Sequence, residues 1–168
     1  MGITNRIGGK RAKSNGEHFE ALIDTACKFY EAAGVAYIVK TPEPMKPLKS
    51  IRAGQFLAVY TKQAQPDYKG TLNGGRAVVF EAKHTANNRI ERNRVTDEQA
   101  AALDIHQRLG AACFVLVSFR FTNFYRVPWI VWRNMQEHFG KVSVNETDLK
   151  PYSVNIMRFL SNLEGERV

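Results

Sequence analysis

The protein has 168 residues, a length that suits one domain with a hydrophobic core of its own. Its 24 lysines and arginines outnumber 16 aspartates and glutamates, which gives a net charge of +8. This excess favours a polyanionic partner, with DNA or RNA ahead of a membrane surface, and the plain alternative is a solvated basic surface. No apolar run approaches the roughly 18 residues that span a bilayer, so we expect no membrane segment.

The N-terminal residues are basic and contain glycine, and we expect residues 1–13 to form a flexible basic tail. Ser14 and Glu17 then form a capping-box pattern, which predicts the start of a helix. Apolar residues follow at helical spacing, and Gly34 supplies a stop. We expect residues 14–168 to form a single domain.

A proline-rich segment follows a short strand predicted at residues 35–39. Three prolines fall within residues 41–47. Because proline removes an amide donor and restricts φ, regular structure is not expected there. A further strand is predicted at residues 55–61. The residues from about 41 to 60 are therefore interpreted as an extended excursion from the domain.

Two strands joined by a tight turn are predicted at the centre of the chain. Residues 67–72 and 76–83 flank Asn73-Gly74-Gly75, whose two glycines accept the positive φ of a hairpin turn. The second strand contains Ala77-Val78-Val79-Phe80, which is apolar on both faces. This pattern places the strand inside a sheet.

A second capping-box pattern, at Thr96 and Gln99, predicts a helix that runs to about Leu109. Two strands and two helices are predicted after it, at residues 112–119, 123–127, 131–139 and 152–163. The alternation of helices and strands, without internal repeats or a clear linker, predicts one mixed α/β domain.

Cysteine, histidine and aromatic residues give weaker signals. Cys27 and Cys113 lie among apolar residues and lack metal-knuckle spacing, so they are interpreted as reduced core residues. No histidine is assigned a catalytic role. Six aromatic residues favour core packing or a dimer contact over base stacking: Phe119, Phe121, Phe124, Tyr125, Trp129 and Trp132. The first residues lack the apolar segment of a secretory signal, which favours a cytoplasmic location.

The predicted hairpin brings two carboxylates and an ammonium group together. A three-residue loop sets Leu72 opposite Arg76, and counting outward sets Asp67 opposite Glu81. Directly opposed residues project from one face, with Cβ atoms roughly 5 Å apart. Lys83 shares that face because it lies two residues beyond Glu81 on the same strand.

Such closely spaced carboxylates repel each other unless a cation neutralises them. Mg²⁺, with Mn²⁺ as a substitute, favours oxygen ligands and often takes only one or two protein carboxylates. Such an ion would polarise a phosphoryl oxygen, and Lys83 would orient or help deprotonate the attacking water or stabilise charge on the phosphate. We expect no small-molecule organic cofactor. The alternative is an exposed Glu81–Lys83 ion pair, with Asp67 beginning a turn.

These motifs resemble the PD-(D/E)xK nuclease superfamily and, more specifically, the RecU family of Holliday-junction resolvases. The most specific stretches are Asp67-Tyr68-Lys69-Gly70 and Phe80-Glu81-Ala82-Lys83. Other matches are Asn15-Gly16, Phe19-Glu20, Lys40-Thr41-Pro42-Glu43-Pro44, Gly75-Arg76 and Asp97-Glu98-Gln99. The resemblance implies a restriction-endonuclease-like fold, with a central mixed β-sheet flanked by helices and a protruding stalk. It also implies a homodimer that makes paired nicks in a four-way DNA junction with Mg²⁺.

Site roles follow from the resemblance by position. It implies that Asp67 and Glu81 are metal ligands and that Lys83 is the catalytic lysine. Glu20 resembles the acidic residue that completes such sites, and the alternative is an exposed helix carboxylate. Gln99 resembles a glutamine that approaches the site from the next helix. Its alternative role, closing the capping box of that helix, is compatible with the first.

Eight basic residues are expected to contact DNA, with a solvated surface as the alternative. They are Arg11 and Lys13 in the tail, Lys46, Lys49 and Arg52 in the excursion, and Arg89, Arg92 and Arg94 after Lys83. Two departures from the family bear on function. Pro66 stands where the family commonly has a hydroxyl residue, and the excursion is shorter than in cellular members. The alternative functions are a restriction- or repair-type nuclease that acts on duplex or flap DNA, and a junction-binding protein that does not cleave.

Overall fold

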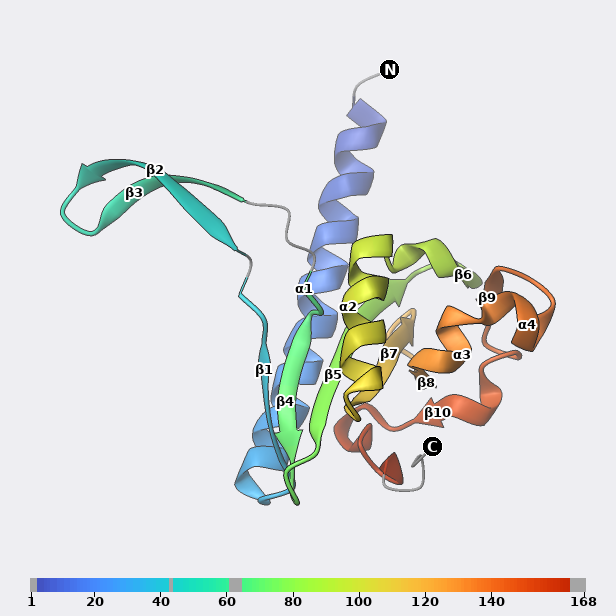
Figure 1. Ribbon diagram of the computed structural model, residues 1–168. Helices are drawn as coiled ribbons and strands as arrows, with labels where there is room; N and C mark the ends of the chain where they lie inside the picture. The colour runs from blue at the N-terminus through green and yellow to red at the C-terminus, as the bar shows by residue number, and fades with distance from the viewer. Residues whose placement is uncertain (1–2, 43, 61–64, 164–168) are drawn as a thin grey trace.

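A six-stranded mixed sheet lies at the centre of the computed structural model, which describes residues 3–42, 44–60 and 65–163 (Figure 1). Its strands, in spatial order, are β1 (Ala36–Lys40), β4 (Tyr68–Leu72), β5 (Ala77–Thr85), β7 (Ala112–Phe119), β8 (Asn123–Pro128) and β10 (Ser153–Val154). β5 and β7 run parallel, and the other neighbouring pairs run antiparallel. The predicted mixed sheet is confirmed.

Helices cover both faces of this sheet. α1 (Ile3–Ala32) packs on one face, where its Phe19 lies in a core with Val78 and Phe80 of β5. α2 (Asp97–Arg108) and α3 (Trp129–Arg133) lie on the other, in a core that contains Val79. Since side chains alternate along a strand, Glu81 follows Val79 toward α2. No helix among the described residues is long and apolar enough to cross a membrane.

Most side chains that were assigned to the core from the sequence are buried there. Cys27 and Cys113 are both free and buried. Four of the six aromatic residues are buried, and Phe121 and Phe124 are partly buried against the core under α1; the buried four are Phe119, Tyr125, Trp129 and Trp132. Core packing is therefore confirmed for this group.

The N-terminal prediction is wrong in its starting point. α1 begins at Ile3 rather than at Ser14, so residues 3–13 belong to the helix. No proline interrupts this stretch, and an internal serine lowers helix stability only slightly. The side chains of Arg11 and Lys13 lie outside the part of the structure that is described. The predicted stop is correct, because Gly34 has a φ of +66° just after the helix ends.

The excursion forms a β-hairpin that projects from the body of the protein (Figure 1). It consists of β2 (Met45–Arg52) and β3 (Gln55–Tyr60), which confirms the strand expected from Gln55; Thr61 lies outside the described residues. β2 includes Pro47, so the expectation of irregular structure throughout residues 41–47 is wrong. The ladder shifts register between Pro47 and Lys49, and such a bulge in a two-stranded ribbon tolerates a missing amide donor.

The C-terminal third differs most from prediction. The helix expected at residues 131–139 is divided at Asn134 into α3 and α4 (Met135–Phe139). The helix expected at residues 152–163 is absent from the described chain, because Ser153 and Val154 pair with β8 as β10. That segment also contains the 3-10 turns η2 (Lys150–Tyr152) and η3 (Ile156–Arg158). A small unpredicted ribbon joins β6 (Arg89–Glu91), which leads into η1 (Arg92–Arg94), to β9 (Ser143–Asn145).

Candidate active site

The central hairpin has the register that was predicted from its turn. The amide of Leu72 donates to the carbonyl oxygen of Arg76, at 2.8 Å. Gly74 and Gly75 have φ values of +89° and +88°, as the turn requires. The ladder pairs Tyr68 with Phe80, and the same register extended by one residue sets Asp67 opposite Glu81.

Three charged side chains meet at the end of this hairpin. The Lys83 ammonium nitrogen lies 2.7 Å from Oε2 of Glu81 and 3.4 Å from Oδ2 of Asp67. The backbone amide of Ala82 also donates to Oδ2 of Asp67, at 2.9 Å, which fixes this carboxylate against β5. The two carboxylates and the ammonium group therefore share one face of the sheet, as the register predicts.

Gln99 joins the site from the first turn of α2. Its amide nitrogen donates to Oε2 of Glu81, at 2.7 Å. The same side chain closes the capping box of α2. Its Oε1 accepts from the backbone amide of Thr96, and the Thr96 hydroxyl oxygen accepts from the backbone amide of Gln99. Both expected contacts of Gln99 are therefore present, and the helix cap itself holds the donor against the carboxylate.

Burial governs the electrostatics of the site. The Glu81 side chain is 0% exposed. Burial raises its pKa to about 8; the Lys83 charge opposes this shift and the Asp67 charge adds to it. Burial also lowers the pKa of Lys83, but Asp67 and Glu81 outweigh that effect and the net shift is upward. Lys83 is consequently a cation at neutral pH.

The residues present fit a divalent cation held by few protein ligands. Oε1 of Glu81 is buried and has no hydrogen-bond partner among the described residues. A buried polar oxygen without a partner is costly, and a hard cation would both satisfy it and favour the ionised form of Glu81. No group of three His, Cys, Asp or Glu side chains arranged to hold a metal occurs in the described chain. Asp67 and Glu81 thus form a two-carboxylate set of the kind that Mg²⁺ accepts together with waters and phosphate oxygens.

Glu20 approaches the site but is already paired. Its carboxylate forms an ion pair with Lys40. Glu20, Lys40 and Asp67 line one small pocket of about 110 Å³, together with Thr41 and Pro66 among others. Glu20 is therefore neither a simple exposed helix carboxylate nor a direct neighbour of Lys83.

Sequence reasoning missed the residues that hold α1 against this end of the sheet. Tyr68 is fully buried, and its hydroxyl lies 3.0 Å from Oδ1 of Asp24 and 3.4 Å from the backbone oxygen of Glu20. Burial is the largest cause of the raised pKa of this phenol, followed by the charge of Asp24. Lys40 also went unassigned, although both residues fall within the motif stretches that carry the family resemblance. Their spacing in sequence does not indicate these contacts with α1.

The six predicted DNA-binding residues whose side chains the structure describes lie in two separate groups. Lys46, Lys49 and Arg52 are exposed along β2 of the projecting hairpin. Arg89 and Arg94 are exposed near β6, and Arg92 is half-buried with its Nε donating to the carbonyl oxygen of Arg133. The hairpin and β6 lie on opposite sides of α2 in Figure 1, so the structure does not merge the two groups into one patch.

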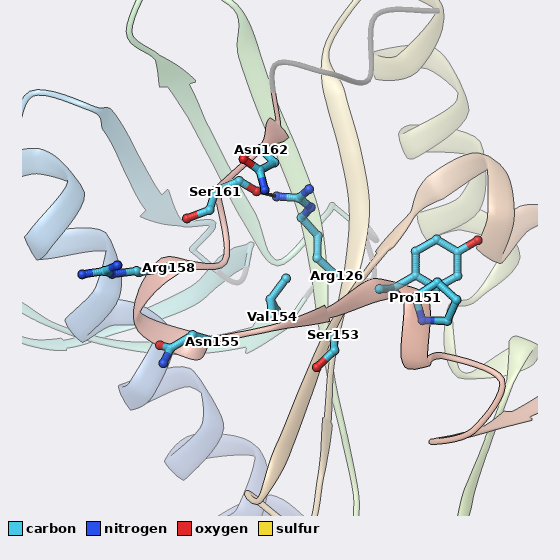
Figure 2. A pocket seen from close by; sticks show the side chains of 9 residues that line it. Arg126, Pro151, Ser153, Val154, Asn155, Arg158, Ser161 and Asn162 are labelled. Atoms are coloured by element: carbon cyan, nitrogen blue, oxygen red, sulfur yellow. Dashed lines mark hydrogen bonds between the residues drawn. The ribbon is translucent and has the colours of Figure 1, made fainter.

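A larger pocket of about 400 Å³ lies near the C-terminal turns, and Figure 2 shows Arg126 in it. One guanidinium nitrogen of Arg126 donates to the carbonyl oxygens of Phe159 and Ser161, both at 2.8 Å, so this side chain fastens the C-terminal turns to β8. Arg126 is opposite Leu116, which is beside Ala82 in the sheet. It therefore projects from the face opposite Glu81 and is not part of the candidate active site.

Comparisons with known proteins agree with this geometry. No curated protein matches the sequence at a significant level. A solved structure of Hjc from Archaeoglobus fulgidus, a Holliday junction resolvase, superposes with a TM-score of 0.51 and 15% sequence identity, covering 84% of this chain and 97% of that one. At this identity the similarity shows a shared fold. Residues 14–162 match the profile of the family described as "Recombination protein U". The chain therefore belongs to the RecU family, as its motifs had indicated.

Proposed function

We propose that the protein is a metal-dependent endodeoxyribonuclease that resolves four-way DNA junctions as a homodimer, by paired symmetric nicks. The observation that carries this proposal is the arrangement of Asp67, Glu81 and Lys83 on one face of a buried hairpin end. Membership of the RecU family and the fold shared with a junction resolvase support the choice of substrate.

Asp67 and Glu81 would hold the divalent ion, with Mg²⁺ preferred and Mn²⁺ as a substitute. When bound, the ion would polarise the scissile phosphate and lower the pKa of a bound water. Gln99 occupies Oε2 of Glu81 and leaves Oε1 available, which orients the carboxylate. The amide of Ala82 does the same for Asp67.

Lys83 acts as a cation in this scheme. Its raised pKa makes it a poor general base at neutral pH, so the role that fits is orientation of the attacking water and stabilisation of charge on the phosphate. Its side chain is 14% exposed, and the ammonium group is therefore mostly shielded from bulk water. Shielding from water strengthens its interaction with a phosphate oxygen.

The positive charge of the protein supports DNA binding, and the paired cuts of the proposed reaction support a dimer. The net charge of +8 and the basic hairpin with Lys46, Lys49 and Arg52 suit a phosphate backbone. Symmetric cuts in two strands need two active sites, which a two-fold dimer supplies.

The test compares a synthetic four-way junction with a linear duplex of the same sequence, with and without Mg²⁺. We expect paired cuts in the junction only when Mg²⁺ is present. Asp67→Asn and Glu81→Gln should each lower the cleavage rate at least about 100-fold while junction binding persists, because they remove transition-state charge stabilisation and not phosphate contacts. Equal cleavage of both DNAs would support the duplex or flap nuclease, and binding without any cleavage would support the non-cleaving alternative.

A further inference from the structure

We infer that the Lys40 ammonium group serves as a built-in second cation of the active site, so that the site takes one divalent ion where it would otherwise take two. This inference deepens the proposed nuclease function and rests on it. It assigns Glu20 to holding Lys40 rather than to binding the metal.

The backbone fixes Lys40 beside the hairpin end. Lys40 is the last residue of β1 and pairs with Tyr68, the first residue of β4. The next amide, that of Thr41, donates to the backbone oxygen of Asp67 at 2.8 Å. The strand that carries Lys40 is thus joined directly to the residue that begins the catalytic hairpin.

The side chain of Lys40 lies against the Glu20 carboxylate and in the same pocket as Asp67. Its ammonium nitrogen forms an ion pair with Glu20, and both residues line the small pocket that Asp67 also lines. The Tyr68 hydroxyl holds Asp24, one helical turn after Glu20, on the same side. Asp24 and Asp67 both act electrostatically on Lys40. The ammonium group therefore has three acidic neighbours from two segments of the chain, since Glu20 and Asp24 are on α1 and Asp67 precedes β4.

The charges of the site support a single divalent ion. Four carboxylates (Glu20, Asp24, Asp67 and Glu81) face two ammonium groups (Lys40 and Lys83). One divalent cation would balance the remaining negative charge, whereas a second would leave an excess positive charge. Without Lys40, Glu20 would lose its ion-pair partner in the pocket that Asp67 also lines, and this added negative charge favours another divalent ion there.

Lys40 is also placed to act on DNA. Its side chain is 44% exposed, so it can reach a phosphate while it remains near Glu20. In two-metal nucleases the second ion stabilises charge on the leaving oxygen. A lysine ammonium is a compact point charge that supplies one positive charge at such a place without a metal.

The test counts Mn²⁺ ions bound per chain in the intact protein, by electron paramagnetic resonance of free Mn²⁺ during titration. Lys40→Met removes the charge at similar length, and Lys40→Arg keeps it. Lys28→Met, at an exposed position of α1 outside the candidate DNA-binding groups, is the control for a lost lysine elsewhere. We expect one ion for the parent protein, for Lys40→Arg and for Lys28→Met, and two for Lys40→Met. Adding Glu20→Gln to Lys40→Met should return the count to one.

A kinetic readout accompanies the titration. The kinetic order of the cleavage rate with respect to Mg²⁺ concentration should rise from one in the parent protein to two in Lys40→Met. Two ions in the parent protein, or one in Lys40→Met, would overturn this inference and leave the proposed nuclease function intact. No ion bound to any of the proteins would instead refute metal dependence itself, and with it this inference.

Discussion

A side-chain hydrogen bond joins Gln99 in the first turn of α2 to Glu81 in β5. The side-chain amide nitrogen of Gln99 donates to the buried Glu81 carboxylate at 2.7 Å. Gln99 also closes the helix cap with Thr96. The capping box therefore has a use beyond helix stability, since it holds a hydrogen-bond donor at the candidate active site.

Thr96→Ala and Gln99→Leu separate these two uses. Thr96→Ala removes the cap alone and should lower the free energy of unfolding by about 1 kcal/mol while most cleavage activity persists. Gln99→Leu should lower stability similarly and also lower kcat about tenfold or more, because Glu81 loses a neutral donor. Urea denaturation and single-turnover cleavage measure the two effects. Equal cleavage rates in the two variants would assign Gln99 to the cap only.

The buried Glu81 carboxyl should make stability fall as pH rises. Its pKa rises from 4.5 to about 8 on folding, first because of burial. Between these values the folded protein binds more protons than the unfolded chain, so the free energy of unfolding decreases with pH. The contribution is at most about 1.4 kcal/mol per pH unit. Denaturation of the metal-free protein between about pH 5 and pH 8 measures it.

Glu81→Gln is the matched comparison for this pH effect, because it removes the titrating group at the same size. Burial lowers the pKa values of His84 and His106, which makes stability rise with pH and so acts in the opposite direction. The difference between parent and variant therefore isolates Glu81. Parallel curves for the two proteins would contradict a raised pKa at this position.

The basic hairpin should contribute to the salt dependence of junction binding. Replacing Lys46, Lys49 and Arg52 with glutamine should weaken binding, because each lost phosphate contact removes counterion release. The slope of log affinity against log salt should flatten by about 2 to 3, from roughly 0.9 per contact. Fluorescence anisotropy with a labelled junction at several salt concentrations measures the slope.

A charge-matched control separates contact from net charge. Lys28, Arg108 and Lys150 are exposed and lie outside the hairpin. Their replacement with glutamine lowers the net charge by the same amount. We expect a much smaller change of slope for this control, and equal slopes for the two triple variants would exclude the hairpin from the interface.

Gly70 should tolerate no side chain. A Cβ atom there would lie 2.2 Å from the backbone oxygen of Tyr37 and 2.7 Å from Cα of Ile38, on the paired strand β1. Gly70→Ala must therefore push β1 and β4 apart, and we expect a loss of about 1–3 kcal/mol in unfolding free energy. Gly16→Ala is the control. Its Cβ would meet nothing within 4 Å inside α1, and it should stabilise the protein by about 0.5–1 kcal/mol. Thermal unfolding that is equal for both variants would contradict this packing.

Local patterns determined the centre of the site from the sequence. The register of the 67–83 hairpin follows from a turn of three residues, since counting outward from Gly74 and Gly75 sets every pair. The capping box at Thr96 and Gln99 depends on residues three apart, and it too could be predicted. Strand β7, which is buried along its whole length, could be predicted because a short continuous apolar run that follows a glycine is typical of a strand inside a sheet. In each case the interacting groups are close in sequence.

The tertiary structure decided the features whose partners are far apart in the chain. The spacing of apolar residues within 152–163 is compatible with a helix. In the structure Ser153 and Val154 instead pair with β8, a partner that the local sequence does not indicate. Pro47 lies in a strand because its partner strand accommodates a bulge. The Glu20–Lys40 ion pair joins α1 to β1, and its place beside Asp67 depends on how α1 packs across the sheet. Local hydrogen-bond patterns are encoded over a few residues, whereas the arrangement of charges around Lys40 exists only after separate elements have packed together.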